Sequence, residues 1–358
     1  MANNSSDLPF QPIRNTLYSS KELMSGYDPA NPDSMASTFD FESYRYYVRC
    51  GGSAVTDPYA GMMEALHDNS ILRAMTKLLQ EVKKPTVAIM GGHNLQRDSA
   101  DYRLVADVAR KLTLESCFVA SGGGPGAMEA THLGALLAHA PNEDVDEAIR
   151  VLKDCAKLPD SKSVLSDDGE QINVKILHEL HAWVRPAQAL ALKYADGPKS
   201  LAVPTWYYGH EPISPFANHV AKYFQNSIRE DVLLSIAANG IIYTRGAAGT
   251  LQEVFQDAAQ NYYPKKGDSF APMVFLGKQF WTEELPVLPL LNSLFIRIGK
   301  RLNQADFDRY IRIVDTVDEA VDALLMHGPS EEKTASRMTS LGFGPMMEQV
   351  RSQLLDDR

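Results

Sequence analysis

The chain has 358 residues, of which 44% are hydrophobic and 22% charged, and its formal net charge is −10. This length is enough for one or two domains with a large core. The negative charge argues against nucleic acid or an anionic membrane as the main partner.

Cysteine usage and the N-terminus favour a cytoplasmic protein. The three cysteines, Cys50, Cys117 and Cys155, show no CxxC spacing, as expected in a reducing compartment. The chain starts without a basic segment followed by an apolar stretch, so no signal peptide is predicted. No apolar run approaches the ~18 residues that a membrane span needs.

Residues 1–83 are expected to form an N-terminal extension. Residues 1–40 are rich in Ser, Asn, Asp and Pro and predict an extended arm. The segment 39–50, FDFESYRYYVRC, fits either a strand or a docking segment. Apolar residues recur with helical spacing over 71–82, which predicts a helix.

From Pro85 onward, short apolar runs alternate with helical patterns. The strands are predicted at 86–92, 117–121, 200–208, 241–244, 271–277 and 310–316. Ser99 is expected to cap one helix, and Ser214-Pro215 to open another that ends at Asn239-Gly240. Six such strands predict an α/β fold, a doubly wound, Rossmann-like parallel sheet with helices on both faces.

This alternation predicts one nucleotide-binding domain over 84–326. A helical insertion is expected at about 141–197, because two helical patterns there flank a polar loop. Residues 327–358 are expected to form a polar C-terminal tail with one amphipathic stretch.

A first glycine-rich turn, SGGGPGAM (121–128), follows the second predicted strand. Its bare amides and the helix behind it suit a phosphate or sugar, but a tight turn without a ligand explains it equally well. Gly122, Gly124 and Ala127 also fit a relaxed GxGxxA dinucleotide fingerprint. The acidic strand end expected about 20 residues on is missing, because that region looks helical. NAD and FAD are therefore discounted, and no cofactor is predicted.

A second turn lies in YTRGAAGTLQEVF (243–255). Gly246 and Gly249 are expected to allow a turn that a Cβ would obstruct. Thr250 and Glu253 have the spacing of a capping box, the structural explanation for Glu253. Arg229, just off the apolar stripe of the preceding helix, favours instead a pocket in which an arginine and a glutamate converge.

Together these motifs resemble the LONELY GUY (LOG) phosphoribohydrolases, once misannotated as lysine decarboxylases, over roughly residues 84 to 326. The segment HEPISPF (210–216) is more similar to the larger bacterial nucleotide 5′-monophosphate nucleosidases of this family. The matching glycine motifs comprise Gly91 and Gly92, then Gly122, Gly123, Gly124, Gly126 and Met128, and last Gly246, Gly249, Thr250 and Glu253. Arg229 matches the family's catalytic arginine.

The resemblance implies hydrolysis of the N-glycosidic bond of a nucleoside 5′-monophosphate, with Arg229 and Glu253 as catalytic residues. The glycine turns would bind phosphate and ribose, and a homodimer or higher homo-oligomer is implied. Two residues depart from the family pattern: Arg245 replaces a proline and Ala247 a glycine. We expect the Arg245 side chain at the pocket mouth, where it would add a second cation for phosphate.

The sequence supports three further interpretations, which concern an alternative function, Glu129 and metal binding. The same fold could serve a non-catalytic carrier or sensor of a nucleotide or pterin cofactor, because fold does not fix function. Glu129 is a second carboxylate near the first turn, explained more simply by the dipole of its helix. None of the nine histidines has a metal-ligand spacing such as HExxH, so no metal site is predicted.

Overall fold

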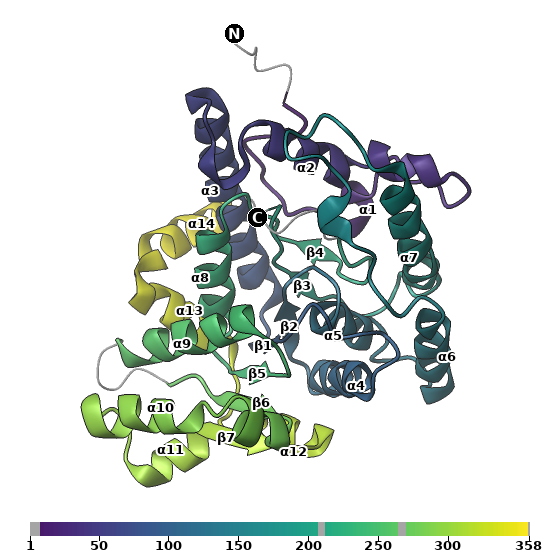
Figure 1. The fold of residues 1–358 in the computed structure, drawn as a ribbon. Coiled ribbons are helices and arrows are strands. Elements are labelled where there is room, and N and C mark those ends of the chain that lie inside the picture. The colour runs from purple at the N-terminus through teal and green to yellow at the C-terminus, as the bar shows by residue number, and fades with distance from the viewer. Residues whose placement is uncertain (1–7, 207–211, 264–269, 357–358) are drawn as a thin grey trace.

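A seven-stranded, all-parallel sheet forms the centre of the protein in a computed structural model that describes residues 8–206, 212–263 and 270–356 (Figure 1). The strand order is β4-β3-β2-β1-β5-β6-β7. The strands are β1 (Thr86–Met90), β2 (Phe118–Ser121), β3 (Leu201–Ala202), β4 (His219–Val220), β5 (Ile241–Tyr243), β6 (Met273–Leu276) and β7 (Ile311–Val314). The doubly wound α/β fold expected from the sequence is confirmed. The chain order reverses between β1 and β5, which makes their carboxyl ends the expected ligand crevice.

Helices cover both faces of this sheet. The N-terminal ones are α1 (Ser20–Leu23), α2 (Phe39–Arg49) and α3 (Pro58–Val82). The central ones are α4 (Ala100–Leu114), α5 (Ala127–Leu136), α6 (Asn142–Lys153), α7 (Val174–Lys193), α8 (Asn226–Ile236) and α9 (Ala248–Tyr262). The last are α10 (Leu288–Asn292), α11 (Gln304–Tyr310), α12 (Val317–Leu325), α13 (Glu331–Met338) and α14 (Gly344–Asp356). Ser99 caps α4 as predicted.

Two hydrophobic cores lie on opposite faces of the sheet. Because successive side chains of a strand point to opposite faces, Ala88 and Met90 of β1 join the core with residues of α3, α8 and α9. Val87 and Ile89 join the second core with residues of α4, α5, α6 and α12. All five residues of β1 are buried, which explains why its sequence is apolar without alternation.

The segment 39–50 is a helix, so its interpretation as a strand is wrong. Thr38 caps α2 by accepting a hydrogen bond from the Phe41 N–H. Phe41, Tyr44 and Tyr47 are all buried, and their spacing of three places them on one face of the helix. β-propensity of the aromatic residues is overridden by this amphipathic pattern.

The helix predicted to open at Ser214-Pro215 begins only at Asn226, and β4 takes the intervening position as a seventh strand. Pairing with β3 decides this, because the Ala221 N–H donates to the Ala202 carbonyl. The N-terminal arm also pairs there through an antiparallel bridge between Tyr18 and Val220. Of the predicted strand at 200–208, only β3 is a strand, and 207–208 lie outside the described residues.

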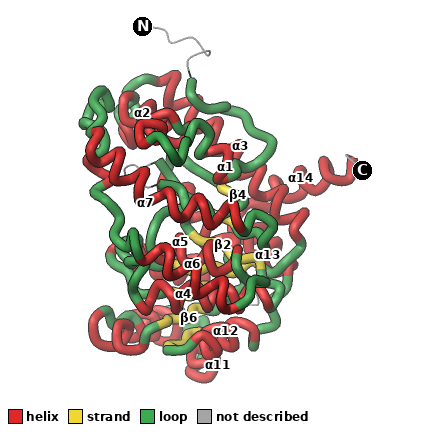
Figure 2. The backbone as a smooth tube through the Cα atoms, turned by 90° about the vertical axis from the view of Figure 1, so that its right-hand side faces the viewer, coloured by secondary structure: helices red, strands yellow, loops and turns green. Residues whose placement is uncertain are grey.

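The two ends of the sheet carry different parts of the chain (Figures 1 and 2). The N-terminal helices lie beside β4, whereas α10, α11 and α12 lie beside β7. The expected arm contains α1 and a short 3₁₀ helix, Pro32–Ser37, within its described part. The C-terminal segment forms α13 and α14, and the Gln80 amide of α3 donates to the Met347 carbonyl of α14.

In the three described ranges, no helix has both the length and the apolar character required to span a membrane.

Close packing of α4 on α5 gives a test of the fold. A Cβ at Gly134 would lie 2.0 Å from the Ala106 carbonyl oxygen. We predict that Gly134→Ala lowers the free energy of unfolding by about 1–3 kcal/mol, because a backbone must move to admit the methyl group. Chemical denaturation measures this. Gly61→Ala is the matched control: its Cβ meets only Val55 at 3.7 Å, so stability should be unchanged or higher by up to ~1 kcal/mol. Equal effects of both substitutions would contradict the packing argument.

Candidate active site

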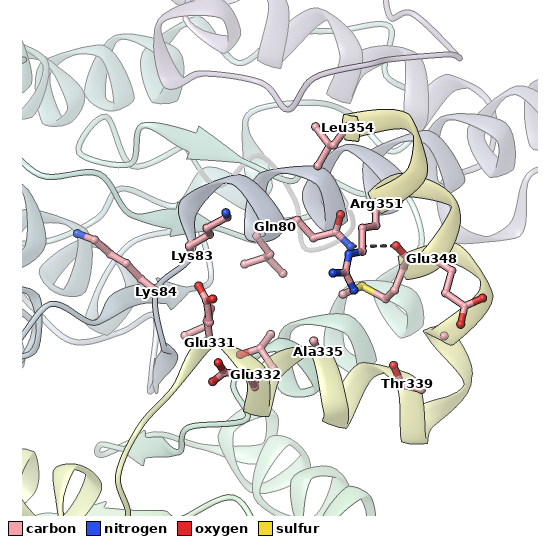
Figure 3. A pocket seen from close by; sticks show the side chains of 15 residues that line it. Gln80, Lys83, Lys84, Glu331, Glu332, Ala335, Thr339, Glu348, Arg351 and Leu354 are labelled. Atoms are coloured by element: carbon pink, nitrogen blue, oxygen red, sulfur yellow. Dashed lines mark hydrogen bonds between the residues drawn. The ribbon is translucent and has the colours of Figure 1, made fainter. Parts of the chain in front are cut away.

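Two large cavities occur among the described residues, and the sheet topology distinguishes them. The larger, about 610 Å³, lies between α3, α13 and α14 and reaches Thr86 at the start of β1 (Figure 3). Its rim mixes cations such as Lys84 and Arg351 with acids such as Glu331 and Glu332. The smaller, about 500 Å³, lies at the carboxyl ends of the strands. Ligands of doubly wound sheets bind at that edge, at the switch point, so the smaller cavity is the candidate site.

The candidate cavity brings together twelve of the fourteen residues predicted from the sequence. They are Gly91, Gly92, Gly123, Gly124, Met128, Arg229, Arg245, Gly246, Ala247, Gly249, Thr250 and Glu253. Gly122 and Gly126 are not among the lining residues. Each is required by packing behind the cavity instead. A Cβ at Gly122 would lie 2.2 Å from the Met128 sulfur, and Gly126 has φ +72° and lies against the Gly92 carbonyl.

The first glycine turn is held in place by hydrogen bonds to its carbonyls. His132 Nε2 lies 2.8 Å from the Gly122 oxygen, and Nδ1 lies 2.9 Å from the Ser200 hydroxyl. Burial lowers the His132 pKa to about 4, so the ring is neutral at pH 7. Since a carbonyl only accepts, Nε2 carries the proton and Nδ1 accepts from Ser200. The Gly123 carbonyl accepts from the Ser214 N–H.

The second glycine turn differs from the sequence prediction in two ways. The helix α9 begins at Ala248 with Ala247 as its N-cap and no capping side chain, so the Thr250–Glu253 capping box is wrong. A Cβ at Gly246 would meet Thr250 Oγ1 at 2.0 Å, but a Cβ at Gly249 would meet nothing within 4 Å. The turn therefore requires glycine at 246 only.

The start of α9 is consequently suited to bind an anion. The first N–H groups of a helix have no acceptor within the helix, and the N-cap residue here, Ala247, has no side-chain acceptor to supply. Ala248, Gly249 and Thr250 all line the cavity. Their amides and the positive end of the helix dipole suit a phosphate group.

Arg229 and Glu253 form a buried pair in this cavity. Arg229 Nη1 lies 3.1 Å from a Glu253 carboxylate oxygen, and Arg229 Nε donates to the Val203 carbonyl at 2.7 Å. Only 8% of Arg229 and 9% of Glu253 are exposed. The two residues come from α8 and α9, so the convergence predicted for them is present. It replaces the capping role that the spacing of Glu253 suggested.

Burial raises the pKa of Glu253 above its ordinary value, and the positive charge of Arg229 opposes that rise. The carboxylate of Glu230 adds to the rise. Glu230 also lines the cavity and accepts hydrogen bonds from Asn226 and Gln252. A buried carboxylate with a raised pKa is a suitable general base at neutral pH.

Arg245 lies at the rim of the cavity, but its guanidinium is engaged by other residues. It pairs with Glu284 at 2.9 Å, lies 3.8 Å from Asp101, and stacks over the Phe280 ring. The side chain is half-exposed. Exposed ion pairs are worth under ~1 kcal/mol, so Arg245 can exchange partners at little cost.

Glu129 does not line the cavity. Its carboxylate accepts two hydrogen bonds from Arg97, at 2.6 and 2.8 Å, and one from Tyr102. Arg97 also donates to the Trp183 carbonyl and lies over its ring. This buried cluster joins α5 to α7. The buried position of Glu129 is therefore explained by its pairing with Arg97. The sequence had suggested only an interaction with the dipole of its helix.

Eight of the described residues that line the cavity were not predicted from the sequence. They are His93, Asn94, Leu95, Lys162, Pro204, Thr205, Glu230 and Ala248. The first three follow Gly92 directly, and proximity to Gly92 was a usable signal for them. Lys162 lies between α6 and α7, and nothing in its local sequence marks it.

No cluster of three or more His, Cys, Asp or Glu side chains that could hold a metal ion occurs among the residues that are described.

No protein-family profile matches the sequence. No curated protein matches it either. Among solved structures, a molybdenum cofactor binding protein from the phototrophic bacterium Rippkaea orientalis is similar at a TM-score of 0.38 and 13% sequence identity. The alignment covers 68% of this chain and 98% of that protein.

The Arg97–Glu129 pair provides a test of structural support for the site. We predict that Arg97→Met lowers the free energy of unfolding by about 3–5 kcal/mol, because it leaves the Glu129 carboxylate buried without its cation. The double variant Arg97→Met/Glu129→Met should recover part of this loss, since no charge is then buried alone. Denaturant titration of both variants measures the difference. A double variant less stable than the single one would contradict this explanation.

Proposed function

We propose that the cavity binds a nucleoside 5′-monophosphate and that the chain hydrolyses its N-glycosidic bond. The observation that carries the proposal is the buried pair of Arg229 and Glu253 beside an uncapped helix start. A carboxylate for ribosyl chemistry and a site for phosphate thus share one cavity. This is the activity implied by the resemblance to the LOG phosphoribohydrolases.

The reaction separates ribose 5-phosphate from the base. The C1′–N bond breaks and its electron pair leaves with the base, so that positive charge develops on the ribosyl group. Water then adds its hydroxide to C1′ and its proton goes to the base. In its ionised form, Glu253 stabilises the ribosyl cation or accepts the proton of the attacking water.

Arg229 supports this chemistry by its position. Its bond to the Val203 carbonyl fixes the guanidinium, and its charge keeps Glu253 ionised at a lower pH than burial alone would allow. A guanidinium N–H of Arg229 that is not bonded to Val203 or Glu253 can also stabilise the departing base electrostatically. The phosphate would lie at the first-turn amides of α9.

The second candidate is a non-catalytic carrier or sensor of a nucleotide or a pterin cofactor. Two observations favour it. Arg229 already has two protein acceptors, Val203 and Glu253, so the pair is stable without a reaction to perform. Ala247, at the N-cap of α9, carries a methyl group where the resembling family has glycine. This candidate predicts binding without release of free base.

Ligand-induced stabilisation tests the binding half of the proposal. A ligand that binds only the folded state raises the melting temperature. We predict that adenosine, guanosine, cytidine or uridine 5′-monophosphate raises it, and that the matched nucleoside, which has no phosphate for the α9 amides, raises it much less. Thermal denaturation with each pair of ligands gives the result. Equal shifts with nucleotide and nucleoside would argue against a phosphate site.

The catalytic half depends on Glu253. We predict that Glu253→Gln lowers turnover by roughly 10²–10⁴-fold, the usual contribution of an acid–base group, while nucleotide binding persists. Chromatographic detection of free base measures turnover. If the parent binds a monophosphate and releases no base, the carrier function replaces the hydrolase.

The pH profile supplies a further check on the same residue. Because burial raises the Glu253 pKa above 4.5 and the ionised form is active, kcat/KM should fall with decreasing pH through a value above 4.5. Arg229→Met removes the opposing cation, so the acid limb of the residual activity should move to still higher pH. An acid limb that moves to lower pH in this variant would contradict the assigned pairing.

A further inference from the structure

We propose that Lys162, from the insertion between α6 and α7, supplies the cation that binds the phosphate of the ligand. The inference rests on the proposed function and specifies which side chain selects a phosphorylated ligand.

Among the described residues, three cationic side chains line the cavity, and two of them are engaged by acids. Arg229 pairs with Glu253, and Arg245 pairs with Glu284. Lys162 is exposed and lines the cavity. Of these three, it is the one for which no hydrogen bond or ion pair occurs within the described parts of the chain. Its ammonium group is therefore available to an anionic ligand without breaking a protein contact.

The nearest acid in sequence does not neutralise Lys162. Asp160, two residues earlier, accepts a hydrogen bond from the Ser163 hydroxyl at 2.7 Å. Asp168 accepts from the Ser166 hydroxyl in the same way. Each of these carboxylates thus accepts a hydrogen bond from a serine of its own turn.

The backbone that carries Lys162 is well anchored. Lys162 is the central residue of a short 3₁₀ turn, Ser161–Ser163, whose next residue, Val164, is fully buried. The Val164 carbonyl accepts from the Asn173 N–H, and Leu165 and Ile172 form an antiparallel bridge. The position of the lysine is thus set before a ligand arrives.

Helix α2 holds the loop between Leu165 and Ile172. Arg45 donates to the carbonyls of Gly169 and Glu170, and Arg49 pairs with the Glu170 carboxylate. At its other side, the insertion is tied to the core of the sheet domain by Arg97, which donates to the Trp183 carbonyl. A lysine on a fixed support loses less freedom on binding than one on a free loop.

The groups that line the cavity indicate the charge of the ligand. The uncapped start of α9 supplies neutral N–H donors and a partial positive charge. A full positive charge lining the same cavity matches a phosphate that carries about −1.5 to −2 charges at neutral pH. Lysine binds phosphate as a point charge without a fixed fork geometry. Lys162 is accordingly a ligand-binding residue that distinguishes nucleotides from nucleosides.

Calorimetric titration of matched variants tests this assignment. We expect Lys162→Met to weaken binding of the best nucleoside 5′-monophosphate about tenfold, as for loss of a charge-assisted hydrogen bond. Affinity for the matched nucleoside should change less than about twofold. Lys162→Arg should keep most of the nucleotide affinity. Lys153→Met, which removes an exposed lysine at the end of α6 that does not line the cavity, should leave both affinities unchanged.

Salt dependence gives an independent readout. Raising the ionic strength weakens an exposed charge pair by screening, so the parent should lose more nucleotide affinity with added salt than Lys162→Met does. The inference is overturned if Lys162→Met binds the nucleotide as the parent does, or loses nucleotide and nucleoside affinity equally. A parent that binds none of the four monophosphates overturns the proposed function as well. Binding that depends on Lys162 without any release of base keeps this inference and removes only the hydrolase.

Discussion

The guanidinium of Arg229 is the point on which the geometry of the cavity depends. It donates to the Val203 carbonyl just after β3 and to Glu253 of α9. A Cβ at Gly122 would lie only 2.6 Å from its Nη2 atom, so the first glycine turn packs directly on it. A buried cation without a partner would be costly. The same pairing therefore links β3, α8 and α9 and opposes the rise that burial causes in the pKa of Glu253, the candidate catalytic carboxylate.

The glycines around this pair serve two different purposes. Gly91 brings the ends of β1 and β5 together, since its Cβ would lie 2.0 Å from the Thr244 hydroxyl oxygen. Gly126, with φ +72°, lets the start of α5 approach the Gly92 carbonyl. These positions concern packing. Gly249 has open space around it, so its missing side chain leaves room in the cavity. A glycine motif in the sequence does not separate these two purposes.

The sequence predicted the elements whose signal is local. The apolar runs of β1 and β2 end in glycines, and both strands and their turns lie where expected. It did not predict β4, because two residues carry no periodicity and their pairing with β3 is a tertiary contact. The good capping signal at Ser214-Pro215 was overridden by that pairing. The spacing of Thr250 and Glu253 was overridden in the same way, because Arg229 offers Glu253 a charged partner from another helix.

Local charge, and not the net charge of −10, decides what this cavity can bind. A polyanion interacts electrostatically with charges over the whole protein. A single phosphate interacts mainly with the charged groups within a few ångströms, because salt screens the more distant ones. Two of the lining arginines are balanced by carboxylates, Arg229 by Glu253 and Arg245 by Glu284. The groups that remain to attract an anion are the start of α9 and Lys162, against the Glu230 carboxylate, which also lines the cavity. An acidic chain can therefore carry a site for a small anion, provided that a helix terminus and a segment far away in the sequence meet at the same edge of the sheet.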